Sequence, residues 1–179
     1  MGSKITVVCG IDPGLKQTGY GVLRVDEDDD SIAVMDAGVI RGTPNESLAL
    51  RLAELAAGID EVLDENDVQV VAVEQVYSHY QRPRTAILMA HARGALLLEA
   101  ARRNCRVIHL PATSVKRHLT GNGRATKEQM QRAVADLLSL GQAPEPPDVA
   151  DALAVALCAV GVMQQRARQT WGNDNLMTH

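Results

Sequence analysis

The sequence KITVVCGIDPG at residues 4–14 predicts a buried β-strand that ends in a tight turn. Residues 4–11 are an apolar run rich in β-branched side chains, which favours a strand in the interior of a sheet. Asp12, Pro13 and Gly14 then supply the residue types that turns prefer. The carboxylate of Asp12 is therefore expected at the end of a core strand.

Four more segments have the composition of strands. Residues 18–25 and 32–41 follow the first strand closely, which favours an antiparallel meander. Residues 68–73 (VQVVAV) are apolar on both faces, as expected inside a parallel sheet, and residues 105–110 (CRVIHL) form the last strand. The right-handed crossover rule places the strand at 68–73 parallel to the first strand.

Apolar residues recur at helical spacing between and after these strands. We expect helices from Leu48 to about Val62, over 84–103, from Thr126 to about Leu140, and from Pro147 to about Met163. The predicted fold class is therefore α/β: a mixed five-stranded sheet flanked by helices, in a single domain at residues 1–163. Residues 164–179 are polar and lack periodicity, which predicts a flexible C-terminal tail.

The composition is that of an ordinary globular protein. The 179 residues are 46% hydrophobic and 22% charged, which argues against a mainly disordered chain. Apolar runs are far shorter than the roughly 20 residues of a membrane span, and no signal peptide precedes the first strand, so we expect no membrane association. Cys9, Cys105 and Cys158 lie in or beside apolar runs without metal-ligand spacing, which predicts buried thiols in a reducing, cytoplasmic setting.

The net charge of −4 conceals a strong asymmetry along the chain. Residues 79–132 carry eleven Lys or Arg and two Asp or Glu, whereas the remainder carries seven Lys or Arg and twenty Asp or Glu. This distribution indicates a basic face on an acidic body, and such a face suits a polyanionic partner. The alternative is a solvated basic helix with no partner.

Four acidic residues stand where a purely structural role explains them poorly. Asp12 and Glu74 each follow a buried strand, and neighbouring parallel strands would bring them to the same edge of the sheet. Asp148 and Asp151 are three residues apart at the start of the last helix and so share one face. That helix is otherwise apolar and must pack on the sheet, which points both acids toward the strand ends.

Carboxylates brought together in this way repel one another unless protons or cations intervene. Oxygen ligands without Cys or His favour Mg²⁺, with Mn²⁺ as a substitute. Two such ions roughly 3.5–4 Å apart would clamp the attacking and leaving oxygens of a phosphodiester. Taken singly, each acid also has a structural explanation, as a turn residue or as a complement to the helix dipole.

Several short motifs resemble those of the RuvC Holliday-junction resolvases, in the same order and with compatible spacing. They are GIDPG at 10–14 with TGYGV at 18–22, EQVY at 74–77, GNGRATKEQ at 121–129 and PDVADALAVA at 147–156. Together they extend over about residues 5–160, which is nearly the whole chain.

The resemblance implies an RNase H-like fold, a homodimer, and Mg²⁺-dependent paired nicking of four-way (Holliday) DNA junctions in homologous recombination and DNA repair. It also implies a branch-migration complex of RuvA and RuvB as a partner. In the family, the acids at the positions of Asp12, Glu74, Asp148 and Asp151 bind the metals and are needed for cutting.

A basic stretch and one aromatic residue are the candidate DNA contacts. Lys and Arg side chains at 113–129 can reach phosphates, although long basic side chains also serve simply to solvate a surface. Tyr77 would stack on an unpaired base at the junction centre or, alternatively, pack half-buried in the fold. The candidates are Tyr77, Lys116, Arg117, Arg124 and Lys127, of which Lys116 and Lys127 match family positions.

Three other functions are compatible with parts of this pattern. The first two are a YqgF-type nuclease and an actin-like phosphotransferase, whose opening strand and turn look similar. The lack of a second nucleotide-binding half disfavours the phosphotransferase. The third is a junction-binding scaffold without activity, which the complete set of acids disfavours.

Overall fold

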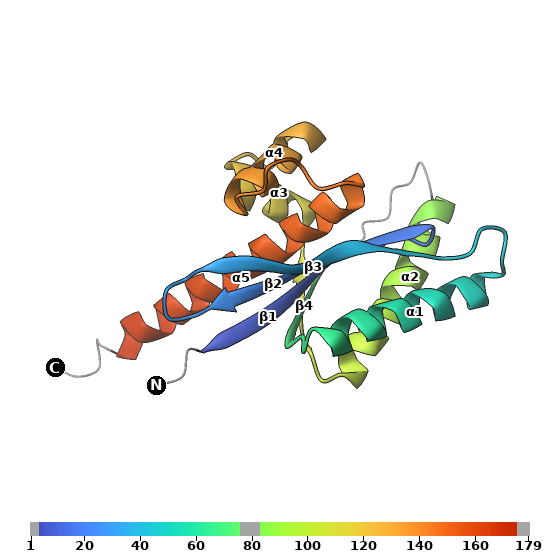
Figure 1. Cartoon of the computed structure of the whole chain (residues 1–179), viewed down its shortest axis with the longest axis horizontal. Helices are drawn as coiled ribbons and strands as arrows, with labels where there is room; N and C mark the ends of the chain where they lie inside the picture. The colour runs from blue at the N-terminus through green and yellow to red at the C-terminus, as the bar shows by residue number, and fades with distance from the viewer. Residues whose placement is uncertain (1–3, 76–82, 175–179) are drawn as a thin grey trace.

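The computed structural model describes residues 4–75 and 83–174, which form an α/β fold. The meander of three strands is followed by helices that alternate with two further strands (Figure 1). The strands are β1 (Ile5–Asp12), β2 (Gln17–Asp26), β3 (Ile32–Arg41), β4 (Val70–Glu74) and β5 (Arg106–Leu110). The helices are α1 (Leu48–Glu65), α2 (Pro83–Arg102), α3 (Ala112–Thr120), α4 (Lys127–Leu137) and α5 (Pro147–Asp174).

The five strands form one mixed sheet in the order β3-β2-β1-β4-β5. The pairs β1–β2 and β2–β3 are antiparallel, whereas β1–β4 and β4–β5 are parallel, so the predicted meander and crossover are both confirmed. Ile11 pairs with Val73 across β1 and β4. The next residue in each strand is acidic, so Asp12 and Glu74 end adjacent strands side by side.

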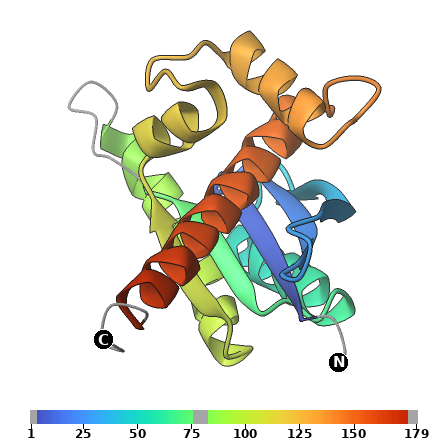
Figure 2. The same ribbon diagram turned by 90° about the vertical axis from the view of Figure 1, so that its left-hand side faces the viewer.

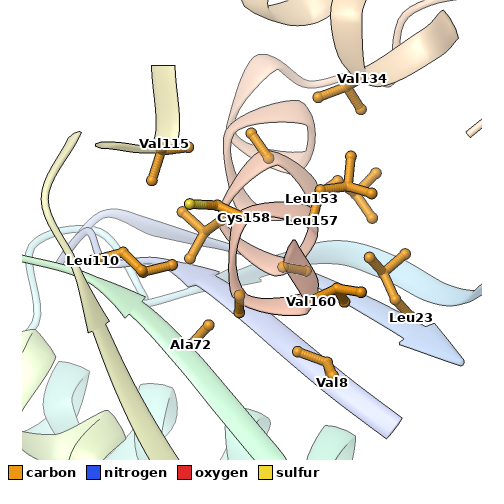
Figure 3. Close-up of a cluster of buried hydrophobic side chains, with 14 of the residues drawn as sticks. Val8, Leu23, Ala72, Leu110, Val115, Val134, Leu153, Leu157, Cys158 and Val160 are labelled. Atoms are coloured by element: carbon orange, nitrogen blue, oxygen red, sulfur yellow. The ribbon is translucent and has the colours of Figure 1, made fainter. Parts of the chain in front are cut away.

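Helices cover both faces of the sheet, as Figures 1 and 2 show from two sides. Helices α1 and α2 pack on one face, and α5 crosses the other, with α3 and α4 beside its N-terminal half. Successive side chains of β1 point to opposite faces of the sheet. Val8 packs in the hydrophobic core under α5, whereas Val7 and Cys9 pack in the core under α1 and α2. Figure 3 shows Val8 and other apolar side chains gathered around α5.

Glycines on β1 and β2 let α5 lie directly against the sheet. A Cβ atom on Gly10 would collide with the carbonyl oxygen of Ala152 and would lie 2.5 Å from the backbone nitrogen of Ala156. A Cβ atom on Gly19 would collide with the carbonyl oxygen of Asp148. Because these two positions carry no side chain, the first turn of α5 reaches the ends of the strands and brings its acids there.

Helix α5 extends well beyond its predicted end near Met163. It continues to Asp174, so the prediction of a flexible tail is wrong for residues 164–174, and residues 175–179 lie outside the described part of the chain. The apolar pattern stops where the core ends, but the helix continues because residues 164–169 (QQRARQ) are good helix formers. Gln164 and Arg168 also bond to the Asp30 carboxylate, at 2.9 Å and 3.2 Å, which ties this extension to the β2–β3 hairpin.

The apolar composition of α5 is explained by its place in the core. Residues Pro147–Gln169 are long and apolar enough to cross a membrane by length and composition, which the expectation drawn from short apolar runs overlooked. However, 61% of the most apolar window is buried inside the fold, as for a core helix of a globular domain.

The three cysteines are free and buried, as predicted.

Candidate active site

Three of the predicted acids line one open cavity at the carboxyl ends of the parallel strands. Asp12 ends β1, Glu74 ends β4, and Asp151 lies in the first turns of α5. The cavity has a volume of about 280 Å³, and Lys116 and Lys127 line it as well. Residues far apart in the sequence thus meet at the edge where α/β sheets place their ligands.

The fourth acid, Asp148, lies on the β2 side of Asp12 and does not line this cavity. Its backbone closely approaches Gly19, the residue that pairs with Asp12 in the β1–β2 register. Its Oδ2 atom accepts a hydrogen bond from Nε2 of Gln17 at 2.7 Å. Asp12 is therefore flanked by Asp148 on the β2 side and by Glu74 on the β4 side.

Asp12 is the centre of this acidic group in electrostatic terms. Burial raises its pKa most, and the charges of Asp151, Glu74 and Asp148 add to the effect in that order, which together bring the pKa to about 7. The pKa of Glu74 is also raised, first by burial and then by the charge of Asp151. A carboxyl group crowded by three others gains most from a bound cation.

Two lysines supply positive charge on the other wall of the cavity. The Lys127 ammonium lies 3.1 Å from Oδ2 of Asp151, and this hydrogen bond raises the pKa of Lys127. Lys116 is half-buried on α3, and its charge partly counteracts the rise in the pKa of Glu74. The two predicted DNA contacts that match family positions therefore lie beside the carboxylates.

The loop between α3 and α4 has a defined local structure. Gly121 ends α3 in the left-handed conformation, with φ of 72°. A capping box begins α4 at Thr126, where the helix was predicted to start: the Gln129 backbone N–H donates to the Thr126 hydroxyl, and the Thr126 backbone N–H donates to the Gln129 side chain. Arg117 and Arg124 are exposed on this segment, outside the cavity.

Arg93 of α2 holds the end of β4 from the opposite side. Its Nε donates to the carbonyl oxygen of Glu74 at 3.2 Å, and its Nη2 lies 2.8 Å from Nδ1 of His109. The sequence pattern did not predict this contact. Tyr77, the predicted base-stacking residue, lies outside the described residues.

The carboxylate oxygens are the type of ligand that a hard divalent cation prefers, although the side chains do not lie close enough together to surround one ion. Within residues 4–75 and 83–174, no three His, Cys, Asp or Glu side chains lie close enough to hold one ion as they stand. The donors are nevertheless all oxygen atoms, and after burial the charges of Asp151, Glu74 and Asp148 raise the pKa of Asp12 against the opposing charge of Lys127. Mg²⁺ and Mn²⁺ prefer such oxygen donors.

Comparisons with known proteins identify the family of this chain. The family model for the crossover junction endodeoxyribonuclease RuvC matches residues 8–159. The chain belongs to the RuvC family. A RuvC of Rhodopirellula baltica is 48% identical over 151 residues, which is 84% of each chain, and a RuvC of Legionella pneumophila is 38% identical over 154 residues, which is 86% of each.

Solved RuvC structures have the same fold. The RuvC of Thermus thermophilus superposes with a TM-score of 0.80 at 33% identity and covers 89% of this chain and 97% of its own. Its complex with a Holliday junction substrate superposes with a TM-score of 0.78 at 34% identity, covering 86% of this chain and 92% of its own. The predicted RNase H-like fold and the resemblance drawn from the motifs are therefore confirmed.

RuvC membership also decides among the alternatives that the sequence left open. The chain is a crossover junction endodeoxyribonuclease and hence a hydrolase of phosphodiester bonds. This identity argues against the YqgF-type nuclease, the actin-like phosphotransferase and the inactive scaffold. The match at residues 8–159 contains all four acids and the basic segment at 113–129.

The raised pKa of Asp12 predicts how the stability of this chain changes with pH when no metal is present. The folded pKa of about 7 lies above the unfolded value of about 4, so protonated Asp12 favours the fold, and this contribution is lost as pH rises through 7. In EDTA, the free energy of unfolding of the wild type should fall by about 2–3 kcal/mol between pH 5 and 8, relative to Asp12→Asn.

Urea denaturation at each pH measures this difference. Asp30→Asn, on the exposed β2–β3 hairpin, serves as the matched control and should follow the wild type. Parallel pH profiles for wild type and Asp12→Asn would contradict the assignment of Asp12 as the crowded carboxyl group.

Proposed function

We propose that this chain resolves four-way (Holliday) DNA junctions by paired, symmetric nicks, hydrolysing one phosphodiester bond in each of two strands with two Mg²⁺ ions per active site. The observation that supports this most is the cavity at the strand ends. It combines three carboxylates from three separate elements with two lysines, and so offers metal ligands and phosphate ligands together.

The carboxylates of Asp12, Glu74, Asp148 and Asp151 would hold the ions, and Asp12 lies between Asp148 on the β2 side and Glu74 on the β4 side. When bound, the divalent ions supply Lewis acidity, which makes water a nucleophile and stabilises charge on the leaving 3′ oxygen. Lys116 and Lys127 face the same cavity and would bind the scissile phosphate. The expected products carry 5′-phosphate and 3′-hydroxyl ends.

The exposed arginines on the α3–α4 segment would grip the DNA backbone away from the reacting phosphate. Arg117 and Arg124 are exposed and stand near Lys116 and Lys127 in the sequence, so DNA bound at the cavity would pass within their reach. The strongly basic charge of residues 79–132 supports the same path. Contacts of this kind fix the position of the DNA and are independent of its sequence.

Replacing both arginines tests this path through the salt dependence of binding. The Arg117→Gln/Arg124→Gln variant should weaken junction binding and flatten the plot of log association constant against log salt concentration by about 0.9 for each lost phosphate contact. Arg106→Gln is the matched control, because Arg106 begins β5 at the end of the sheet opposite the cavity. Fluorescence anisotropy in EDTA measures both slopes, and an unchanged slope in the double variant would remove this surface from the DNA path.

Paired nicks require two active sites, and α2 offers a surface for a second copy of the chain. Ile87 and Leu98 are 56% and 51% exposed. Gly94 lies between them on the same helical face, with no atom within 4 Å of a Cβ built on it. An exposed apolar stripe with a small residue at its centre suits close helix packing, so we place the homodimer interface here.

A charge on this stripe should separate the dimer. Ile87→Glu is expected to shift the protein from dimer to monomer at micromolar concentration, because it would bury a carboxylate in an apolar interface. Leu137→Glu on α4 is the matched control, because Leu137 is also 56% exposed. Light scattering coupled to gel filtration gives the masses, and a wild-type-like dimer for Ile87→Glu would place the interface elsewhere.

A cleavage assay tests the proposed function as a whole. The purified chain is incubated with a labelled four-way junction, a linear duplex and an RNA–DNA hybrid, each with Mg²⁺, Mn²⁺ or EDTA. We expect symmetric nicks in the junction alone, in Mg²⁺ and in Mn²⁺ but not in EDTA. Equal cutting of the duplex or the hybrid, or cutting in EDTA, would contradict the proposal.

The cellular setting follows from the same proposal. We expect the chain to act in the cytoplasm, in homologous recombination and DNA repair, together with RuvA and RuvB. Its buried, unpaired cysteines are compatible with a reducing compartment.

A further inference from the structure

The Asp148 carboxylate is held by a short chain of hydrogen bonds that the sequence did not reveal. Gln17 Nε2 donates to Asp148 Oδ2 at 2.7 Å, and Arg41 Nε donates to Gln17 Oε1 at 3.1 Å. Gln17 is the first residue of β2 and pairs with Arg41, the last residue of β3. These two hydrogen bonds therefore link Arg41 at the end of the edge strand β3 to Asp148 in the first turn of α5.

The direction of each bond in this chain is fixed by chemistry. An arginine side chain can only donate, so the atom of Gln17 that faces Arg41 must be the amide oxygen. The amide nitrogen of Gln17 then has to face Asp148, where it meets an acceptor. Arg41 thus prevents the flip that would turn the Gln17 oxygen toward the carboxylate and repel it.

Asp148 and Asp151 have different kinds of partner, although they share one helical face. Asp151 pairs with the Lys127 ammonium at 3.1 Å, whereas Asp148 is held by a neutral amide. A neutral donor fixes the position of a carboxylate without cancelling its charge. Gln17 therefore holds the Asp148 carboxylate on the β2 side of Asp12 without placing a positive charge beside it.

We propose that Gln17 is a positioning residue that orients the Asp148 carboxylate for metal binding, and that Arg41 sets the orientation of the Gln17 amide. This inference rests on the proposed function, since it concerns the same metal site. Hydrogen-bonding partners behind metal ligands commonly contribute about 10–100-fold to metal affinity or activity. Gln17 itself touches neither the metal nor the DNA in this scheme.

Removal of the amide tests the inference through metal affinity. Gln17→Met preserves side-chain length without the donor, and Mn²⁺ binding to the DNA-free protein should weaken about 10–100-fold, measured from the EPR signal of free Mn²⁺. Nicking should need correspondingly more Mg²⁺, while junction affinity in EDTA stays unchanged. Gln164→Met is the matched control, because it removes the same type of bond, from Gln Nε2 to Asp Oδ1 at 2.9 Å, far from the site.

A second variant separates positioning from folding. Arg41 is exposed, so Arg41→Met should leave the fold intact while weakening Mn²⁺ binding by a smaller factor, because the Gln17 amide is then free to flip. The double variant should be no worse than Gln17→Met alone, since both changes remove one chain of bonds. If the losses of Mn²⁺ affinity in the two single variants add up in the double variant, Arg41 does not act through Gln17 and the role given to it is wrong.

The outcomes distinguish this inference from the proposed function. If the wild type neither binds Mn²⁺ nor nicks the junction, the proposed function fails. If the wild type does both and Gln17→Met and Arg41→Met bind Mn²⁺ equally well, Gln17 only joins β2 to α5 and the inference is wrong. A lower melting temperature with unchanged Mn²⁺ affinity would likewise show that Gln17 has only a structural role.

Discussion

Replacement of Asp12 by Asn is expected to reduce Mg²⁺-dependent nicking of a four-way junction by about 10³-fold or more. Asn has nearly the shape of Asp but lacks the charge that would hold a cation between the flanking acids. The charges of all three other acids raise the pKa of Asp12, so its replacement removes the carboxylate on which their repulsion converges. The rate of nicking under single-turnover conditions measures the effect.

Junction binding by Asp12→Asn should remain within about threefold of wild type in EDTA, because the phosphate contacts come from lysines and arginines rather than from the acid. Asp30→Asn should cut and bind like the wild type, since Asp30 lies on the β2–β3 hairpin and bonds to the far end of α5. Substantial Mg²⁺-dependent nicking by Asp12→Asn would remove Asp12 from the catalytic residues.

Substitution of Gly10 by Ala should destabilise the fold by about 3 kcal/mol or more. The added methyl group would meet backbone atoms of Ala152 and Ala156, which cannot move aside as the end of a flexible side chain can. Helix α5 would have to lift from β1, and Asp151 would be carried away from Asp12. Urea denaturation followed by circular dichroism measures the change in unfolding free energy.

Gly141→Ala is the matched control for this prediction, because no atom lies within 4 Å of a Cβ built at that position. Its unfolding free energy should stay within about 0.5 kcal/mol of wild type. A Gly10→Ala protein that is as stable as Gly141→Ala would show that α5 does not rest on β1 as closely as described.

The sheet and three of its acids could be predicted because strong local patterns determine them. The apolar runs before Asp12 and Glu74 are buried on both faces, and the crossover rule makes their strands parallel, so the two carboxylates have to meet. The phase of α5 fixes the direction of Asp151 in the same way. Each of these predictions uses only the apolar pattern of a strand or helix and a general rule of strand connection or helix periodicity.

The hydrogen bonds around the acids could not be predicted because they depend on register and on side-chain conformation. Gln17 reaches Asp148 only because β2 begins where it pairs with Arg41, and no sequence pattern fixes that register in advance. The ion pair between Lys127 and Asp151 joins two helices whose relative position follows from the packed core. The extension of α5 to Asp174 was missed because it lies beyond the apolar pattern that predicted the helix.

The carboxylates at the strand ends are central to the proposed function because they would hold divalent cations together. Anomalous X-ray scattering from crystals soaked in Mn²⁺ tests this most directly. We expect Mn²⁺ peaks between the oxygen atoms of Asp12, Glu74 and Asp151, with Asp148 turned toward them and no peak in Asp12→Asn crystals. Wild-type crystals in which these oxygens point apart, with no peak among them at saturating Mn²⁺, would contradict it.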